Sequence, residues 1–361
     1  MRARVFVFMA ALAVGLALPV PARARVDVWG EADWSTVVKG GPWGMTVDAQ
    51  SAVVTIQSGW VRALSLEGRS KWETAVDGVA WANPAITRDA VLVGATGRVV
   101  ALDRKTGALR WEQPLSGEIT AVALAGRYAL AGDPQGDLRA FDASTGRPAW
   151  DVHYDGEVVS APQVDLDRAI VVAAWHFSAE PAVRGLDLAT GAPRWIQKVS
   201  ELTAAPVVHG GHAYVATGDG HHRAWVAALD LTTGRADWAL IVPASFQSGV
   251  VPGVDKRDVV VADQLGGVSA VDAHTGHERW RRELKRPVVE TSVVLLPRRV
   301  VLTSVTGELF VLDRVTGRII ARGDMQTFDG LPSGVERFDR SRVLVALGAT
   351  APATVELRRV P

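Results

Sequence analysis

The sequence predicts an all-β fold, an eight-bladed β-propeller of four-stranded antiparallel blades, because one short phrase recurs along it at nearly regular intervals. The phrase is Asp-x-x-Thr-Gly-x-x-x-Trp, and five full copies end at Trp111, Trp150, Trp195, Trp238 and Trp280. The glycines of these copies are 39 to 45 residues apart. A period of about forty residues in a chain of short β-forming segments is typical of a radial array of small sheets.

Each repeat unit contains four short strands, which we designate A to D. In residues 117–154, three β-forming segments separated by Gly, Asp or Pro turns precede a fourth that carries Trp150. The Asp-x-x-Thr-Gly phrase then forms the C–D turn, where Gly takes a positive φ, and Trp packs on the neighbouring blade. We therefore expect a structural role for Trp34, Trp72, Trp111, Trp150, Trp195, Trp238, Trp280, Gly107, Gly146, Gly191, Gly234, Gly276 and Gly317.

The two ends of the sequence predict how the ring closes. Residues 330–360 contain three strand-like segments, one fewer than a full blade. Trp34 lies 38 residues before Trp72, in phase with the repeat. We therefore expect the strand around Trp34 to supply strand D of the last blade, which removes an open sheet edge. In the seventh blade Ala321 stands at the Trp position, so Ala321→Trp is predicted to be tolerated.

The first 24 residues have the pattern of a secretory signal peptide. Arg2 and Arg4 precede an apolar stretch, and Ala22-Arg23-Ala24 is typical of a cleavage site. The apolar stretch is too short to span a membrane comfortably. We therefore expect residues 1–24 to be removed and residues 25–361 to form one propeller domain, exported to the periplasm without direct membrane insertion.

Composition excludes several classes of chemistry. The chain has no cysteine, so disulfides, thiolate nucleophiles, Cys-ligated metals and a lipid-anchored cysteine are impossible. The formal net charge is +0, with no long run of one sign, which argues against a nucleic-acid partner.

The extended phrase Ala-x-Asp-x-x-Thr-Gly-x-x-x-Trp, as in residues 101–111 and 228–238, resembles the PQQ-type propeller repeat. That repeat occurs in quinoprotein dehydrogenases and in the BamB-type subunit of the outer-membrane β-barrel assembly machinery. Eight blades, a closing N-terminal strand and short connections are similar to the BamB group. The resemblance implies a monomeric, non-catalytic scaffold without cofactors that binds envelope proteins, among them β-barrel assembly components. BamB-type proteins are typically lipoproteins, and this chain lacks the cysteine that a lipid would require.

The alternative reading is a quinoprotein-like, PQQ-dependent dehydrogenase, or a small-ligand binder that uses the central channel. The quinoprotein resemblance implies a Ca²⁺ ion held by Glu, Asn and Asp oxygens, and a vicinal Cys pair over the quinone. This chain has no cysteine, and its only asparagine is Asn83, which is expected at the entry to a strand A. We therefore expect no quinone and no catalytic residues.

The histidines are expected to bind no metal. On a propeller the D–A and B–C connections emerge on one face, here called the connection face, and the A–B and C–D turns emerge on the other, here called the turn face. His209 and His212 fall in an A–B turn, whereas His221 and His222 fall in a B–C connection. The two pairs are separated by a strand length of roughly 15–20 Å and cannot share an ion.

Aromatic residues outside the motif concentrate on the connection face. Trp43 and Trp81 are expected in D–A connections, and Trp60, Trp175 and Trp225 in B–C connections. Tryptophan is enriched at protein–protein hot spots, although such rings also pack beneath loops. These five residues are therefore our candidate partner-binding residues.

Overall fold

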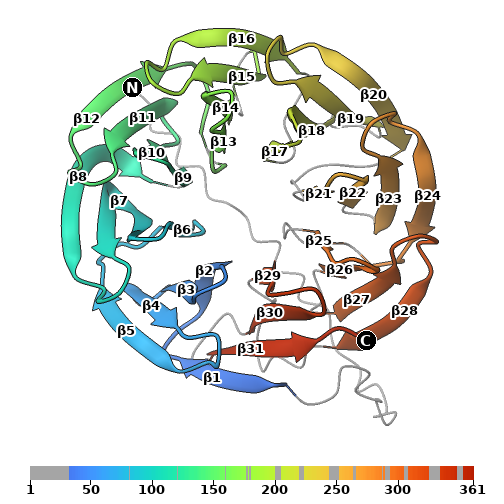
Figure 1. The fold of residues 1–361 in the computed structure, drawn as a ribbon, viewed down its shortest axis with the longest axis horizontal. Coiled ribbons are helices and arrows are strands. Elements are labelled where there is room, and N and C mark those ends of the chain that lie inside the picture. Colours follow the sequence, from blue (N-terminus) through green and yellow to red (C-terminus); the bar gives the residue numbers. More distant parts are fainter. Residues whose placement is uncertain are drawn as a thin grey trace, which may run out of the picture.

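The computed structural model is a closed ring of eight small antiparallel sheets around a central axis (Figure 1). The described residues are 32–80, 82–119, 121–158, 160–175, 178, 180–199, 205–218, 223–243, 252–262, 266–286, 288, 293–304, 308–324, 334–347 and 353–361. The proposed signal peptide, residues 1–24, lies outside them. The prediction of an eight-bladed all-β propeller is confirmed.

Within most blades the strands follow chain order, from the innermost strand A to the outermost strand D. Blades 1 and 2 contain β2 (Pro42–Val47), β3 (Ala52–Ile56), β4 (Trp60–Leu64) and β5 (Ser70–Ala75), then β6 (Ala85–Ile86), β7 (Ala90–Asp103) and β8 (Leu109–Glu118). Blades 3 and 4 contain β9 (Ala121–Ala125), β10 (Tyr128–Gly132), β11 (Asp137–Asp142) and β12 (Pro148–His153), then β13 (Gln163–Asp165), β14 (Ile170–Trp175), β15 (Ala182–Asp187) and β16 (Pro193–Lys198).

The second half of the ring repeats this arrangement. Blades 5 and 6 contain β17 (Val207–His209), β18 (His212–Gly218), β19 (Arg223–Asp230) and β20 (Ala236–Pro243), then β21 (Gly253–Val254), β22 (Asp258–Ala262), β23 (Gly267–Asp272) and β24 (Glu278–Glu283). Blade 7 contains β25 (Val294–Leu295), β26 (Arg299–Thr303), β27 (Glu308–Asp313) and β28 (Ile319–Asp324). Blade 8 contains β29 (Gly334–Arg337), β30 (Arg342–Leu347) and β31 (Ala353–Arg359), with β1 (Trp34–Val38) as its outermost strand.

Blade 2 differs from the others because its strands B and C are one continuous element, β7. This strand turns sharply at Gly97, whose φ is +71°. Its first half pairs with β6, with Ala85 opposite Leu92, and its second half pairs with β8, with Ala101 opposite Trp111.

The ring closes through the N-terminal strand, as predicted. Strand β1 pairs antiparallel with β31, with Trp34 opposite Leu357 and Val38 opposite Ala353. This pairing covers the outer edge of the C-terminal strand, which otherwise presents unpaired N–H and C=O groups to solvent.

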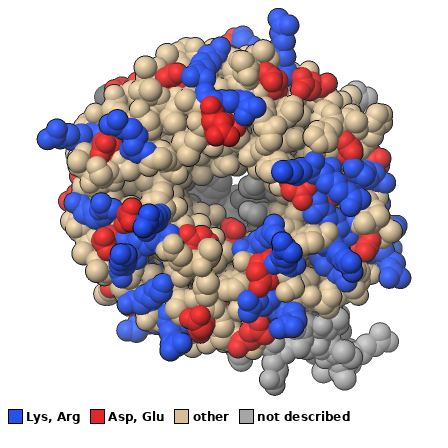
Figure 2. Space-filling view, viewed as in Figure 1, with Lys and Arg blue, Asp and Glu red and all other residues tan. Residues whose placement is uncertain are grey.

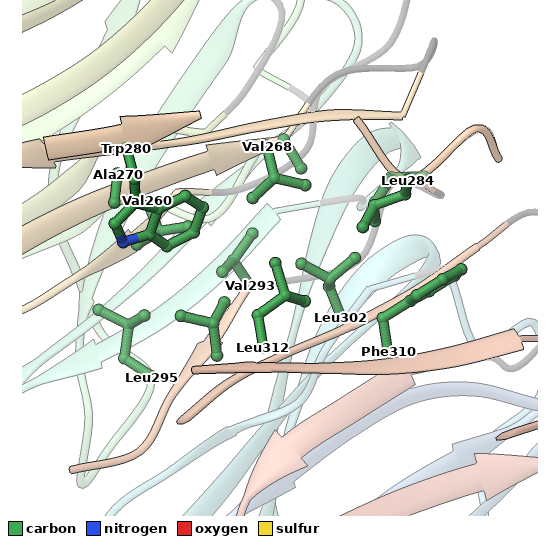
Figure 3. Close-up of a cluster of buried hydrophobic side chains, with 13 residues drawn as sticks. Val260, Val268, Ala270, Trp280, Leu284, Val293, Leu295, Leu302, Phe310 and Leu312 are labelled. Carbon is green, nitrogen blue, oxygen red and sulfur yellow. The ribbon is translucent and has the colours of Figure 1, made fainter. Parts of the chain in front are cut away.

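The hydrophobic core is divided into eight clusters, one at each interface between neighbouring blades. Figure 3 shows the cluster between blades 6 and 7, where Trp280, Val260 and Ala270 face Leu295 and Leu312. Because both sides of each blade are covered by a neighbour, the central strands are almost continuously apolar, as in β14.

The motif tryptophans join each blade to the next one. The indole Nε1 of Trp72 donates a hydrogen bond of 2.8 Å to the carbonyl oxygen of Arg104, which directly follows the motif Asp of blade 2. Six further indoles make the equivalent bond, with acceptors at the corresponding turn position of the following blade: Trp34 to Leu66, Trp111 to Ala143, Trp150 to Leu188, Trp195 to Leu231, Trp238 to Ala273 and Trp280 to Arg314.

Each motif glycine lies against the indole ring of the preceding blade. Gly107 has a φ of +72°, and a Cβ placed on it would come within 2.6 Å of the Trp72 ring. The same short approach to a tryptophan ring occurs at Gly68, Gly146, Gly191, Gly234, Gly276 and Gly317. The motif is therefore an inter-blade contact as well as a turn.

Ala321 is the informative exception, because it occupies the Trp position of blade 7. The following blade takes strand C from β31 and strand D from β1, so no C–D turn joins them. An indole at position 321 therefore has neither a turn carbonyl nor a motif glycine to meet. Ala321 is 4% exposed and packs with Val343 and Val345. Ala321→Trp is therefore expected to overpack this interface, contrary to the expectation from the sequence that it is tolerated.

Candidate functional site

Two of the candidate tryptophans are accessible at the edge of the connection face. Trp60 is the first residue of β4 and is 37% exposed. Trp225 lies in β19, is half-buried and pairs with Thr217 and Ile241. Each precedes by three positions the residue that pairs with a motif tryptophan, Ala63 and Ala228 respectively. They therefore occupy equivalent places in blades 1 and 5.

The predicted positions were wrong for all four described candidates, because each lies in a strand and not in a connection, Trp60 and Trp225 included. Trp43 is the second residue of β2, a strand A, and is half-buried against the cluster between blades 1 and 2. Trp175 is the last residue of β14 and is 0% exposed, and its Nε1 donates a 3.0 Å hydrogen bond to the carbonyl oxygen of Gly136. A fully buried ring offers no area to a partner. Trp81 lies outside the described residues.

Trp175 instead forms part of a cluster around Arg184, a residue that the sequence analysis did not single out. The guanidinium carbon of Arg184 lies 4.2 Å from the ring centroid of Tyr154 and 5.0 Å from that of Trp175. The two rings meet edge to face, with centroids 5.0 Å apart and an interplanar angle of 81°. The cluster joins the end of blade 3 to strands B and C of blade 4. No local motif marks it, because its members come from three separate segments.

The described histidines are dispersed, and two of them lie within hydrogen-bond distance of an aspartate side chain. Nδ1 of His153 lies 2.8 Å from Asp137 Oδ1, and Nε2 of His212 lies 2.8 Å from Asp237 Oδ2. His209 and His212 face each other across the A–B turn of blade 5. Within the part of the chain that the structure describes, no three His, Asp or Glu side chains gather as a metal site requires. His221 and His222 lie outside that part.

Asn83 acts across a blade interface. Its Oδ1 accepts a 3.0 Å hydrogen bond from the backbone N–H of Met45 in blade 1. The side chain thereby satisfies a backbone donor of strand β2, which is a structural use of the only asparagine in the chain.

Carboxyl groups of two kinds have shifted pKa values. Hydrogen bonds from the side chains of Ser144 and Thr145 lower the pKa of Asp142, a motif residue, to about 2. Burial raises the pKa of Glu336 to about 7. Glu336 lies in β29, the innermost strand of blade 8, opposite Leu344. The first shift belongs to the turn scaffold, and the second marks a carboxyl near the axis of the ring that titrates near neutrality.

Charge on the turn face is finely mixed. Figure 2 shows Lys and Arg side chains adjoining Asp and Glu around the ring, with uncharged surface between these small clusters. Individual ion pairs in turn positions include Arg194 with Asp187 at 2.6 Å and Arg168 with Asp165 at 3.1 Å. Surface pairs of this kind contribute little stability each, about 0–1 kcal/mol. No helix among the described residues is long and apolar enough to span a bilayer.

Comparison with known proteins places the repeat in a family. The sequence profile of the family described as outer membrane protein assembly factor BamB matches residues 24–122, 95–240, 176–287 and 222–345. BamB from Kangiella koreensis is 32% identical over 127 residues, which are 35% of this chain. This chain covers only 31% of the length of that relative in the alignment.

Solved structures agree with the fold. The crystal structure of BamB from Moraxella catarrhalis superposes with a TM-score of 0.72 and 20% identity, covering 90% of this chain and 98% of that one. The quinohemoprotein alcohol dehydrogenase from Comamonas testosteroni superposes with a TM-score of 0.69 and 15% identity, covering 92% of this chain and 77% of that one. At such identities the likeness concerns the fold alone, because this fold hosts both functions.

Proposed function

Because the chain belongs to the family described as outer membrane protein assembly factor BamB, we propose that it is a non-catalytic docking subunit in the assembly of outer-membrane proteins. The observation that carries this proposal is the family match, which extends over almost the whole propeller, residues 24–345. The proposed partners are other envelope proteins, including components of the β-barrel assembly machinery.

We place this activity in the periplasm. The charged start, apolar stretch and Ala-x-Ala site of residues 1–24 support export, with residues 25–361 as the mature domain. Without a cysteine the chain takes no thioether lipid, so its association with the outer membrane would depend on protein partners.

We propose that the partner docks on the connection face. Trp60 and Trp225 are held by strands C of a rigid ring, each paired on both sides, so presenting them to a partner requires little ordering. Truncating a tryptophan at the centre of a true interface typically costs about 2 kcal/mol or more of binding free energy.

A genetic complementation experiment tests this proposal. In the organism that encodes the chain, deletion of the gene is expected to lower the amount of folded β-barrel protein in the outer membrane. The wild-type gene should restore that amount, whereas the double variant Trp60→Ala/Trp225→Ala should restore it poorly. Unchanged outer-membrane protein levels after deletion would refute the assembly role.

Matched controls separate docking from folding. His274→Ala and Val315→Ala alter exposed positions in C–D turns, on the opposite face, and should complement fully. Melting temperatures of all purified variants should agree within a few degrees. If the tryptophan variants fold normally and complement fully, the docking surface lies elsewhere on the protein.

A further inference from the structure

The guanidinium of Arg184 is buried without a counter-ion. The residue is 9% exposed, and within the described part of the chain neither Nε nor Nη1 has a hydrogen-bond partner. The other two buried arginines in the described part of the chain donate hydrogen bonds to aspartate side chains. Arg104 donates to Asp48 at 2.5 Å, and Arg314 donates to Asp258 at 2.7 Å and to Asp255 at 2.6 Å. Of the three buried arginines in the described part of the chain, two are paired with carboxylates and the third, Arg184, has unused donors.

The aromatic neighbours of Arg184 do not satisfy these donors. Tyr154 and Trp175 contact the guanidinium through their ring faces, a cation–π arrangement that stabilises the charge. Guanidinium N–H groups lie in the plane of the group and point outward from its edge, so they still require acceptors. Since the Trp175 indole is anchored on Gly136, the rings also hold the cation in one position.

Glu180, the carboxylate whose charge acts on Arg184, is already paired with another cation. Glu180 forms a 2.8 Å ion pair with Lys198, and both side chains are largely exposed. Burial lowers the pKa of Arg184, and the influence of Tyr154 and Glu180 offsets this only in part. This pattern is expected of a cation that has been dehydrated without an opposing charge.

Two further unpaired polar atoms belong to connections next to blade 4 in the chain. Ser160 belongs to the D–A connection between blades 3 and 4, and Ser178 belongs to the B–C connection of blade 4. The Oγ atoms of both are buried without a hydrogen-bond partner. Together with Nε and Nη1 of Arg184, they are four of the seven buried side-chain polar atoms without a partner in the described chain. A buried donor without a partner is costly unless a ligand supplies an acceptor, and this holds above all for the charged guanidinium of Arg184.

We propose that Arg184, flanked by Tyr154 and Trp175, is the anchor of an anion-binding site between blades 3 and 4 that accepts a carboxylate. A carboxylate has two acceptor oxygens in a plane, so that one oxygen can accept from the unpaired Nε–H while the other accepts from Nη2 on the same edge of the guanidinium. This inference stands independently of the assembly role, because a free carboxylate and the carboxylate of a bound polypeptide use the same chemistry.

Nuclear magnetic resonance of arginine side chains tests the proposed site directly. One Nε–H signal of the wild-type protein, identified by its loss in Arg184→Lys, should move downfield and saturate as acetate is added. The same concentration of chloride at equal ionic strength should leave it in place. If the signal is unmoved by acetate, or moves equally with chloride, the proposal fails.

Two variants and two peptides complete the experiment. Arg184→Lys keeps the charge but loses the paired donors and should weaken acetate binding at least fivefold, and Arg184→Met should abolish the acetate-dependent rise in melting temperature. A rise that persists in Arg184→Met would overturn the proposal. A response to N-acetyl-Ala-Asp-amide that N-acetyl-Ala-Asn-amide does not elicit supports a polypeptide carboxylate, whereas a response to acetate alone supports a small free carboxylate.

Discussion

The contribution to stability of the contact between a motif glycine and the indole of the preceding blade can be measured by substituting two glycines of blade 2. Gly107 and Gly97 have nearly the same φ, +72° and +71°. A Cβ on Gly107 would come 2.6 Å from the Trp72 ring and 2.6 Å from Thr74 Oγ1, whereas a Cβ on Gly97 would meet no atom within 4 Å. Gly97→Ala therefore isolates the backbone strain, and Gly107→Ala adds the collision.

The expected magnitudes follow from these distances. A left-handed alanine costs about 1 kcal/mol relative to glycine. Carbon atoms prefer separations of about 3.5–4.0 Å, so the Trp72 ring must move by about 1 Å. That ring is 8% exposed and its Nε1 is bonded to Arg104, which leaves it little freedom to move. Overpacking of this kind adds about 1–3 kcal/mol, so Gly107→Ala should be destabilised by about 2–4 kcal/mol in total.

Urea unfolding followed by tryptophan fluorescence is a suitable assay. The unfolding midpoint should fall much further for Gly107→Ala than for Gly97→Ala. In a Trp72→Ala background the extra cost of Gly107→Ala should shrink towards that of Gly97→Ala, which a double-mutant cycle measures as coupling. Equal destabilisation of the two single variants would refute the conclusion that the glycine is required by the ring.

Three further outcomes are expected. Deleting residues 25–40 removes β1 and exposes the edge of β31, so the protein should aggregate and melt at a lower temperature, and a monomer with unchanged melting temperature would contradict the closure. Ala321→Trp should lose about 1–3 kcal/mol of unfolding free energy in the same urea assay, because a buried alanine is overpacked and no turn carbonyl receives the indole. The raised pKa of Glu336, about 7, means that its contribution to stability is full below its usual pKa of 4.5 and is lost as pH rises through 7. Glu336→Gln should therefore gain stability relative to wild type between pH 5 and 8 in thermal melts, and parallel pH profiles would rule this out.

Much of the fold was predictable from the sequence because the repeat carries its own structural requirements. A positive φ selects glycine, the turn selects Asp and Thr, and the inter-blade contact selects Trp, so the regular spacing of five full copies reveals the repeat and its period. The spacing of Trp34 before Trp72 similarly predicted the closing strand. The last blade lacks a strand D, and the N-terminal strand has no blade of its own, so the two are expected to pair. Family membership is encoded in the same residues.

The candidate site was predicted less well, because the exposure of a side chain depends on which strand ends where. Trp175 was expected in a connection, but β14 extends to include it, and blade 3 covers its ring. Trp60 and Trp225 remain accessible where they lie, at the first position of β4 and the third position of β19, the C strands of blades 1 and 5. Exposure is a property of the assembled ring, and no local pattern distinguishes these tryptophans from one another.

The sequence by itself therefore determined the blade count, the closure and the absence of cysteine chemistry, each of which follows from local turn geometry or composition. Only the tertiary structure decided that Ala321 lacks a receiving turn, and that Arg184 is buried between Tyr154 and Trp175 with unused donors. The physical reason is distance along the chain. Contacts between neighbouring blades join residues about thirty or more positions apart, such as Trp175 and Gly136, where |i−j| is 39. Whether a polar group finds a partner across such an interface is settled only when the ring is closed.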